Sequence, residues 1–203
     1  MNTTCSIHDM ANLKASIFQL IFFASCFFYL ESTAQEFKGI LIIGATAAQI
    51  DGDDLGGFDK AGFQIGGGVS FPLSEKVALQ PEILFSQKGS KSRRNEPFFN
   101  WQLNYIDMPL LIKYRINEQF VVHAGAAANY LLSARFDAGF GFTDQSEAFK
   151  QVDFAANAGV EYFFNEAWSA NANLVSSVVS AGKFQRYYNR TIHFTLRYHL
   201  LPK

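Results

Sequence analysis

Charged side chains and histidines that could move protons recur at alternate positions in several segments of the chain. They are Glu82, Asp107, Lys113, Arg115, His123, Asp153, Glu161, His193 and Arg197. Serines share this face with the histidines and aspartates, so a lipid hydrolase or acyltransferase is one interpretation. The sequence lacks the Gly-x-Ser-x-Gly motif that exposes a nucleophilic serine on a sharp turn, and scattered serines and histidines are common. We therefore predict that the protein is not an enzyme.

An acidic run, Asp51-Gly52-Asp53-Asp54, has the residue types of a calcium-binding loop. An EF-hand loop needs a glutamate at its twelfth position, where this sequence has Gly62. A solvated acidic loop is therefore the preferred interpretation. Metal, nucleotide and cofactor motifs are absent from the sequence, and a net charge of −1 excludes a polybasic nucleic-acid binder.

The charged residues and histidines stand at alternate positions, and this spacing predicts that β-strands position them. After residue 36 no segment has a sustained helical period, whereas apolar and polar residues alternate with period two. The segment 151–164 is the clearest, because Phe154, Ala156 and Val160 alternate with Asp153 and Glu161. We predict eight strands, at about 37–49, 63–71, 77–88, 106–115, 120–133, 151–164, 168–178 and 188–199.

The connections between the predicted strands alternate strictly between short and long. Short turns are expected around 74–76, 117–118 and 165–166, and long connections at about 50–60, 89–101, 134–149 and 180–187. Transmembrane barrels have short periplasmic turns and long extracellular loops. The pattern therefore predicts an antiparallel up-and-down transmembrane β-barrel, with short turns at its periplasmic end and long loops at its extracellular end.

The polar face of the strands is the one expected to line the lumen. It carries many small residues, which suit a narrow interior: Gly66, Gly68, Ser70, Gly125, Ala127, Gly159, Asn171 and Asn173. Aromatic residues of the apolar face gather near the strand ends, as in the girdles of membrane barrels. A charged fraction of 17% and an aromatic fraction of 16% also favour lipid outside. A soluble exported barrel that binds an apolar ligand is the alternative.

The N-terminal segment 1–34 has the features of a cleaved signal peptide. Lys14 precedes an apolar run that ends at Leu30, and the small residues Ser32 and Ala34 define a cleavage site before Gln35. The run is shorter than the roughly 20 residues of a spanning helix, which disfavours an uncleaved anchor. The barrel domain would then be 35–203, without cysteine, because Cys5 and Cys26 are removed.

Two stretches resemble a known family. The "PE-hydrophobic-SQKG" pattern of 81–89 and the "Y-x-x-x-P-L-L-x-K-Y" pattern of 105–114 are similar to those of small outer-membrane β-barrel domain proteins of the PorT-like type. The resemblance covers about 37–200. It implies a protein of the Gram-negative outer membrane with envelope or secretion-system proteins as partners, and it implies no specific activity.

The lumen of such a barrel is expected to hold a polar cluster and no cofactor. An eight-stranded barrel is only wide enough for its own side chains, so we expect the charges to pair into a plug. The cluster comprises Glu82, Asp107, Lys113, Arg115, His123, Asp153, Glu161 and Arg197. A narrow pore for small solutes is the alternative. The function predicted is a structural, surface-interaction or secretion-accessory role.

Two further expectations concern the wall and one long connection. Pro81 and Pro109 lie inside predicted strands, where each removes a ladder donor, so we expect a β-bulge at each. The residues Lys88, Lys91, Arg93 and Arg94 form a basic segment. It is expected either to contact lipopolysaccharide phosphates, which arginine and lysine bind well, or to be a hydrated basic loop.

Overall fold

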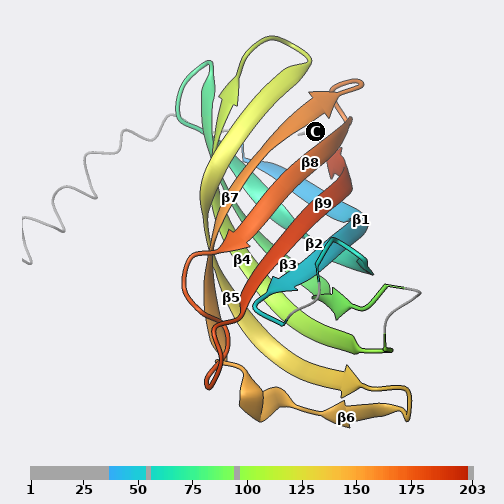
Figure 1. The fold of residues 1–203 in the computed structure, drawn as a ribbon. Helices are drawn as coiled ribbons and strands as arrows, with labels where there is room; N and C mark the ends of the chain where they lie inside the picture. Colours follow the sequence, from blue (N-terminus) through green and yellow to red (C-terminus); the bar gives the residue numbers. More distant parts are fainter. Residues whose placement is uncertain (1–36, 54–55, 94–96, 201–203) are drawn as a thin grey trace, which may run out of the picture. The chain divides into compact units, whose positions relative to one another are not determined.

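The computed structural model describes residues 37–53, 56–93 and 97–200, and these form a closed antiparallel β-barrel (Figure 1). The wall strands are β1 (Lys38–Asp51), β2 (Lys60–Pro72), β3 (Val77–Lys91), β4 (Asn100–Arg115), β5 (Phe120–Asp137), β7 (Val152–Phe163), β8 (Trp168–Ser177) and β9 (Tyr188–His199). Each pairs with the next wall strand in the chain, and β9 pairs with β1 to close the cylinder. The predicted eight-stranded up-and-down barrel is confirmed. The predicted signal segment 1–34 lies outside the described residues.

The two faces of each wall strand differ as the alternation predicted. Along β9 the inward side chains Asn189, Thr191, His193, Thr195, Arg197 and His199 are buried. The outward Phe194 is 59% exposed. In β1 both faces are apolar: Ile40 and Ile42 are buried inside, while Leu41 and Ile43 point outward. An outer surface of large apolar side chains is typical of a wall that faces lipid.

Three short turns join β2 to β3, β4 to β5 and β7 to β8, and they share one hydrogen-bond pattern. Ser74 Oγ accepts from the backbone N–H groups of Lys76 and Val77. Asn117 Oδ1 and Asn165 Oδ1 each accept two N–H groups in the same way. Asn and Ser favour such turns because their side chains mimic a backbone acceptor. These turns lie at the upper end of Figure 1, which we name the short-turn end.

The long connections lie at the opposite end, named here the long-loop end (Figure 1). The longest contains the short strand β6 (Phe142–Asp144), which pairs with the end of β5, and the 3-10 turn η1 (Ser146–Ala148). The expected loop 134–149 is therefore partly ordered as strand. Asp137 Oδ1 accepts from the N–H groups of Gly139 and Gly141, which both have positive φ. The hydroxyl and N–H of Ser146 lower the pKa of the exposed Asp144.

The expected bulges at Pro81 and Pro109 are absent. In the β2–β3 ladder, Gln80 and Pro81 have no paired residue on β2, and the pairing has the same register on both sides of them. The β3–β4 ladder does the same opposite Pro109. A proline removes one donor, and the loss of single ladder bonds is tolerated here without an inserted residue.

The register shift lies instead between β4 and β5. Asn104 pairs with Ser133 and Tyr105 pairs with Leu131, so Leu132 is the extra residue on β5. A bulge moves the following side chains to the other face of the sheet. Ala134 is consequently buried with 0% exposure, in the interior of the long-loop end.

Glycines on the inner face allow neighbouring strands to approach closely. A Cβ atom built on Gly125 would lie 2.1 Å from the carbonyl oxygen of Leu110, and one on Gly66 would lie 2.2 Å from that of Ile83. Any larger residue would push the strands apart. Within residues 37–53, 56–93 and 97–200, no helix has the length and apolarity to cross a membrane.

Candidate functional site

The polar cluster predicted for the lumen lies inside the barrel, with one exception. Glu82, Asp107, Lys113, His123, Asp153, Glu161 and Arg197 are all at most 5% exposed. Arg115 also stands at an inward position, but it is exposed at the short-turn end because β4 ends there. The prediction that Arg115 shares the buried cluster is therefore wrong.

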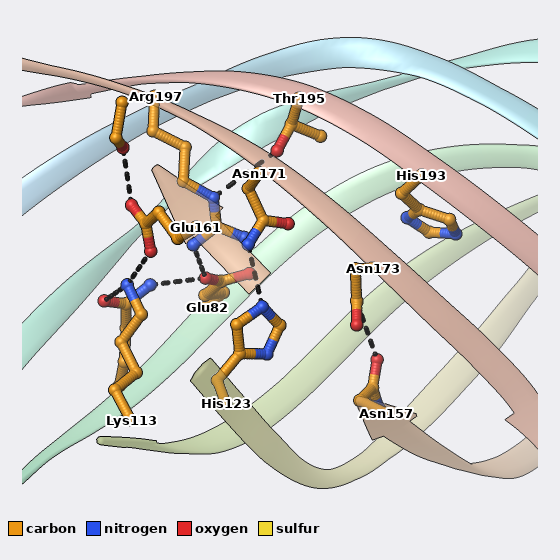
Figure 2. Close-up of polar contacts among 12 residues, drawn as sticks. Glu82, Lys113, His123, Asn157, Glu161, Asn171, Asn173, His193, Thr195 and Arg197 are labelled. Atoms are coloured by element: carbon orange, nitrogen blue, oxygen red, sulfur yellow. Dashed lines mark hydrogen bonds and ion pairs between the residues drawn. The ribbon is translucent and has the colours of Figure 1, made fainter. Parts of the chain in front are cut away.

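Five of the buried side chains form one continuous network (Figure 2). Arg197 Nη1 lies 2.7 Å from Glu82 Oε1, and Gln80 Nε2 donates to the same oxygen at 2.5 Å. Gln80 Oε1 accepts from Lys113 Nζ at 2.9 Å, and Lys113 forms an ion pair with Glu161. The network joins strands β9, β3, β4 and β7. The positive charges of Arg197 and Lys113 are thus matched by the carboxylates of Glu82 and Glu161, and all four side chains are buried.

A serine and a histidine contact Glu161 on the side nearer the short turns. Ser169 Oγ donates to Glu161 Oε1 at 2.5 Å and lies 2.8 Å from His199 Nε2. The same His199 Nε2 is 3.3 Å from Glu161 Oε1. A catalytic triad instead places the serine and the acid on opposite ring nitrogens of the histidine. Ser169 is also 0% exposed, so this arrangement is not that of a nucleophile.

A second buried ion pair lies closer to the long-loop end. Lys88 Nζ is 2.7 Å from Asp107 Oδ1 and 4.9 Å from the centre of the Tyr105 ring. Lys88 is 1% exposed, so the expectation that it belongs to a basic loop contacting lipopolysaccharide is wrong. β3 extends to Lys91 and directs Lys88 inward. Of that basic segment, Lys91 is exposed, Arg93 lies 3.2 Å from Asp59, and Arg94 is outside the described residues.

Neutral polar groups hold the remaining acid of the cluster. Asp153 Oδ2 accepts from Ser177 Oγ at 2.7 Å and from Asn189 Nδ2 at 3.2 Å. Asn189 Nδ2 also lies 3.3 Å from the hydroxyl of Tyr105. These bonds compensate part of the cost of burying the carboxyl group.

The middle of the interior is lined with amides and imidazoles, as Figure 2 shows. Asn171 Nδ2 is 2.7 Å from His123 Nε2, and Asn173 donates to Asn157 at 3.3 Å. The cavity that these side chains line has a volume of about 10 Å³. A single water molecule needs about that much space. The cavity at this level therefore has room for about one water molecule.

An apolar cluster closes the interior at the long-loop end. Its buried members are Ile50, Leu103, Tyr105, Leu131, Ala134, Phe149 and Ala181. Phe149 and Ala181 come from the long connections, which are joined by a hydrogen bond from Lys150 N to Ala181 O at 2.7 Å. Trp101 and Tyr187 pack against Phe149, with ring centres 5.3 and 5.6 Å away. We call this cluster the apolar cap.

Several residues of the interior were not named as site residues from the sequence. Gln80, Ser169, Tyr105 and Lys88 all contact the charges directly. The period-two rule places all four on the lumen face, because each stands an even number of residues from Glu82, Asn171 or Asp107. Nothing in the sequence alone indicates which of them contact which charge. Within the part of the chain that the structure describes, no group of three or more His, Cys, Asp or Glu side chains could hold a metal ion.

Comparison with known proteins relates both the sequence and the fold to membrane barrels. The family model described as "Outer membrane protein beta-barrel domain" matches residues 20–199. No curated protein matches the sequence.

Solved structures share the fold at low sequence identity. One is Ail, the attachment invasion locus protein of Yersinia pestis, in complex with the heparin analogue sucrose octasulfate. It is 17% identical, covers 81% of this chain and 99% of its own, and has a TM-score of 0.55. Another is Neisserial surface protein A, which is 11% identical, covers 79% of this chain and 96% of its own, and has a TM-score of 0.53.

Proposed function

The chain belongs to the family of outer membrane protein beta-barrel domains, and from this premise we propose that it is a non-enzymatic, non-conducting barrel that presents long loops at the cell surface. Its location is the outer membrane of a Gram-negative bacterium. Export there would require the segment 1–34 to act as a signal peptide that is removed before Gln35.

The observation that carries this proposal is the closed interior. Two ion pairs join strands that are not neighbours on the wall, the central cavity has about 10 Å³, and the apolar cap covers the long-loop end. Pores of the porin type need a wide water-filled channel, which takes many more strands. A filled eight-stranded barrel is better suited to anchoring its loops than to passing solutes.

A surface role is supported by the chemistry of the long-loop end. Phe140 is 99% exposed at the tip of the connection after β5, and Phe184 is 85% exposed between β8 and β9. Solvent-exposed aromatic side chains are common at protein contact sites. Ail, which has the same fold, was solved with a heparin analogue. We propose that this end contacts surface molecules such as lipopolysaccharide. The secretion-accessory role implied by the PorT-like resemblance is a second proposal.

Single-channel recording tests the non-conducting barrel. The purified protein in a planar bilayer should show no steady conductance of porin size, and Glu82→Gln should show none either. A reproducible open channel whose ion selectivity changes with Glu82→Gln would refute the proposal and favour the narrow pore.

Extraction from membranes separates the barrel from the soluble alternative. The protein should stay with the membrane in high salt and should be released by detergent, because its outward apolar side chains contact lipid. Release by salt alone would support a soluble exported barrel.

A further inference from the structure

A cavity of about 360 Å³ opens at the short-turn end of the barrel, between the short turns and the charged network. We name it the vestibule. Inward side chains at the ends of the strands line it, and its floor consists of Gln80, Lys113 and His199. Beyond this floor, toward the long-loop end, the next cavity has only about 10 Å³, and the apolar cap covers the far end of the barrel. The vestibule is therefore open at one end only. Its volume lies at the lower end of the range for small-molecule sites.

The charged side chains at inward strand positions of the vestibule are all cations. Lys38 begins β1, Arg115 ends β4, and Lys113 lies deeper, where Glu161 neutralises it. Lys76, in the turn between β2 and β3, also lines the cavity. In the described part of the chain, no ion pair engages Lys38, Lys76 or Arg115. A cavity that is lined by cations and open at one end has a positive potential, so it raises the local concentration of anions.

Two acids belong to the vestibule, but they stand at its rim. Glu75 and Glu166 are exposed and lie in the short turns, outside the strand ends. They reduce the positive potential at the mouth without contributing a carboxylate to the inner wall. A bound anion would therefore sit deeper than these turns, beside Arg115.

The wall of the vestibule also has an apolar part. Val77 and Phe163 are half-buried there, Val121 is buried, and the Phe163 ring lies 4.9 Å from the imidazole of His199. We propose that the vestibule binds a small amphipathic anion, whose carboxylate is held by Arg115 and whose apolar body packs on Val121 and Phe163. Arginine is suited to the first task because its planar donor fork matches a carboxylate.

Ligand-observed fluorine NMR on the full mature chain in lipid nanodiscs tests this site. The probe is 4-(trifluoromethyl)benzoate, and the neutral 4-(trifluoromethyl)benzamide is its matched control for partition into lipid. The benzoate should bind saturably and the amide should not. Arg115→Gln should weaken benzoate binding roughly tenfold or more, because it removes a charge-assisted contact.

Two further variants separate a specific site from a general charge effect. Lys91→Gln, at the long-loop end, removes the same charge far from the vestibule and should leave the affinity unchanged. Glu166→Gln should leave it unchanged or increase it. Equal binding of the two probes, loss of affinity in Lys91→Gln, or no change in Arg115→Gln would each overturn the proposal. Binding of an acidic peptide without binding of the benzoate would also overturn it. None of these outcomes depends on whether the barrel conducts ions.

Discussion

Arg197 of β9 and Glu82 of β3 meet at 2.7 Å inside the barrel, although β1 and β2 separate their strands. Both side chains are at most 4% exposed. The pair therefore spans the lumen instead of linking neighbours on the wall. It joins two strands that share no backbone ladder.

Breaking this pair on one side should destabilise the barrel strongly. Arg197→Met leaves the Glu82 carboxylate buried and unpaired, which costs about 3–5 kcal/mol. The free energy of unfolding, measured by urea titration in detergent micelles, should fall by a similar amount. Restoring neutrality with Glu82→Gln in the same chain should recover part of the loss.

The exposed pair of Arg190 and Asp51 provides the control for this experiment. Arg190 Nε lies 2.8 Å from Asp51 Oδ2 at the rim, and its side chain is 51% exposed. Arg190→Met should therefore change the free energy of unfolding by no more than about 1 kcal/mol. Equal losses in Arg197→Met and Arg190→Met would contradict the view that the interior charges depend on pairing.

Two phenylalanines of the same long connection should differ sharply in their contribution to stability. Phe149 is 1% exposed in the apolar cap, so Phe149→Ala should cost about 3–5 kcal/mol of unfolding free energy. Phe140 is 99% exposed, and Phe140→Ala should leave the free energy of unfolding unchanged. A stable Phe149→Ala variant would mean that the cap does not close the barrel.

The orientation of the barrel in the membrane can be read from cysteine labelling. Residues 35–203 contain no cysteine, so single variants Ala138→Cys and Glu118→Cys give unambiguous signals. Both positions are exposed, one at each end of the barrel. A bulky maleimide that does not cross the outer membrane should label Ala138→Cys on intact cells and Glu118→Cys only after lysis. The reverse pattern would place the short turns outside.

Processing at the predicted site gives a defined mass. We expect the protein isolated from outer membranes to begin at Gln35, because Ser32 and Ala34 provide the small residues that signal peptidase requires. Intact-protein mass spectrometry measures this directly. Retention of 1–34, or a lipid on Cys26, would show that the segment acts as an anchor.

The faces of the strands could be predicted from the sequence because side chains alternate with a period of two. That rule correctly places His123, Asp153 and Glu161 inside, and it holds wherever the register is regular. It carries no information on depth along the barrel axis. Arg115 obeys the alternation and is nevertheless exposed, since it is the last residue of β4.

Two features could not be predicted from the local sequence pattern. Lys88 fits both the inward face of the predicted strand 77–88 and the basic segment that follows it, and its pairing with Asp107 on the next strand decides between the two. The bulge at Leu132 has no glycine or proline to mark it, whereas Pro81 and Pro109 suggested bulges that did not form. In both cases the deciding partner lies on a neighbouring strand.

The pairing of β1 with β9, which we call the seam, predicts the order in which the ladders of the barrel form. Every other ladder of the wall joins strands that follow each other in the chain. Hairpins such as β2–β3 can therefore form locally, with pairing that starts at the turn. The seam instead brings together the two ends of the described chain, as in the pairing of Ile42 with Arg197. Closing the longest loop costs the most chain entropy, and non-local pairing is slow. We therefore expect a curved, open sheet of hairpins to form first and the seam to zip last.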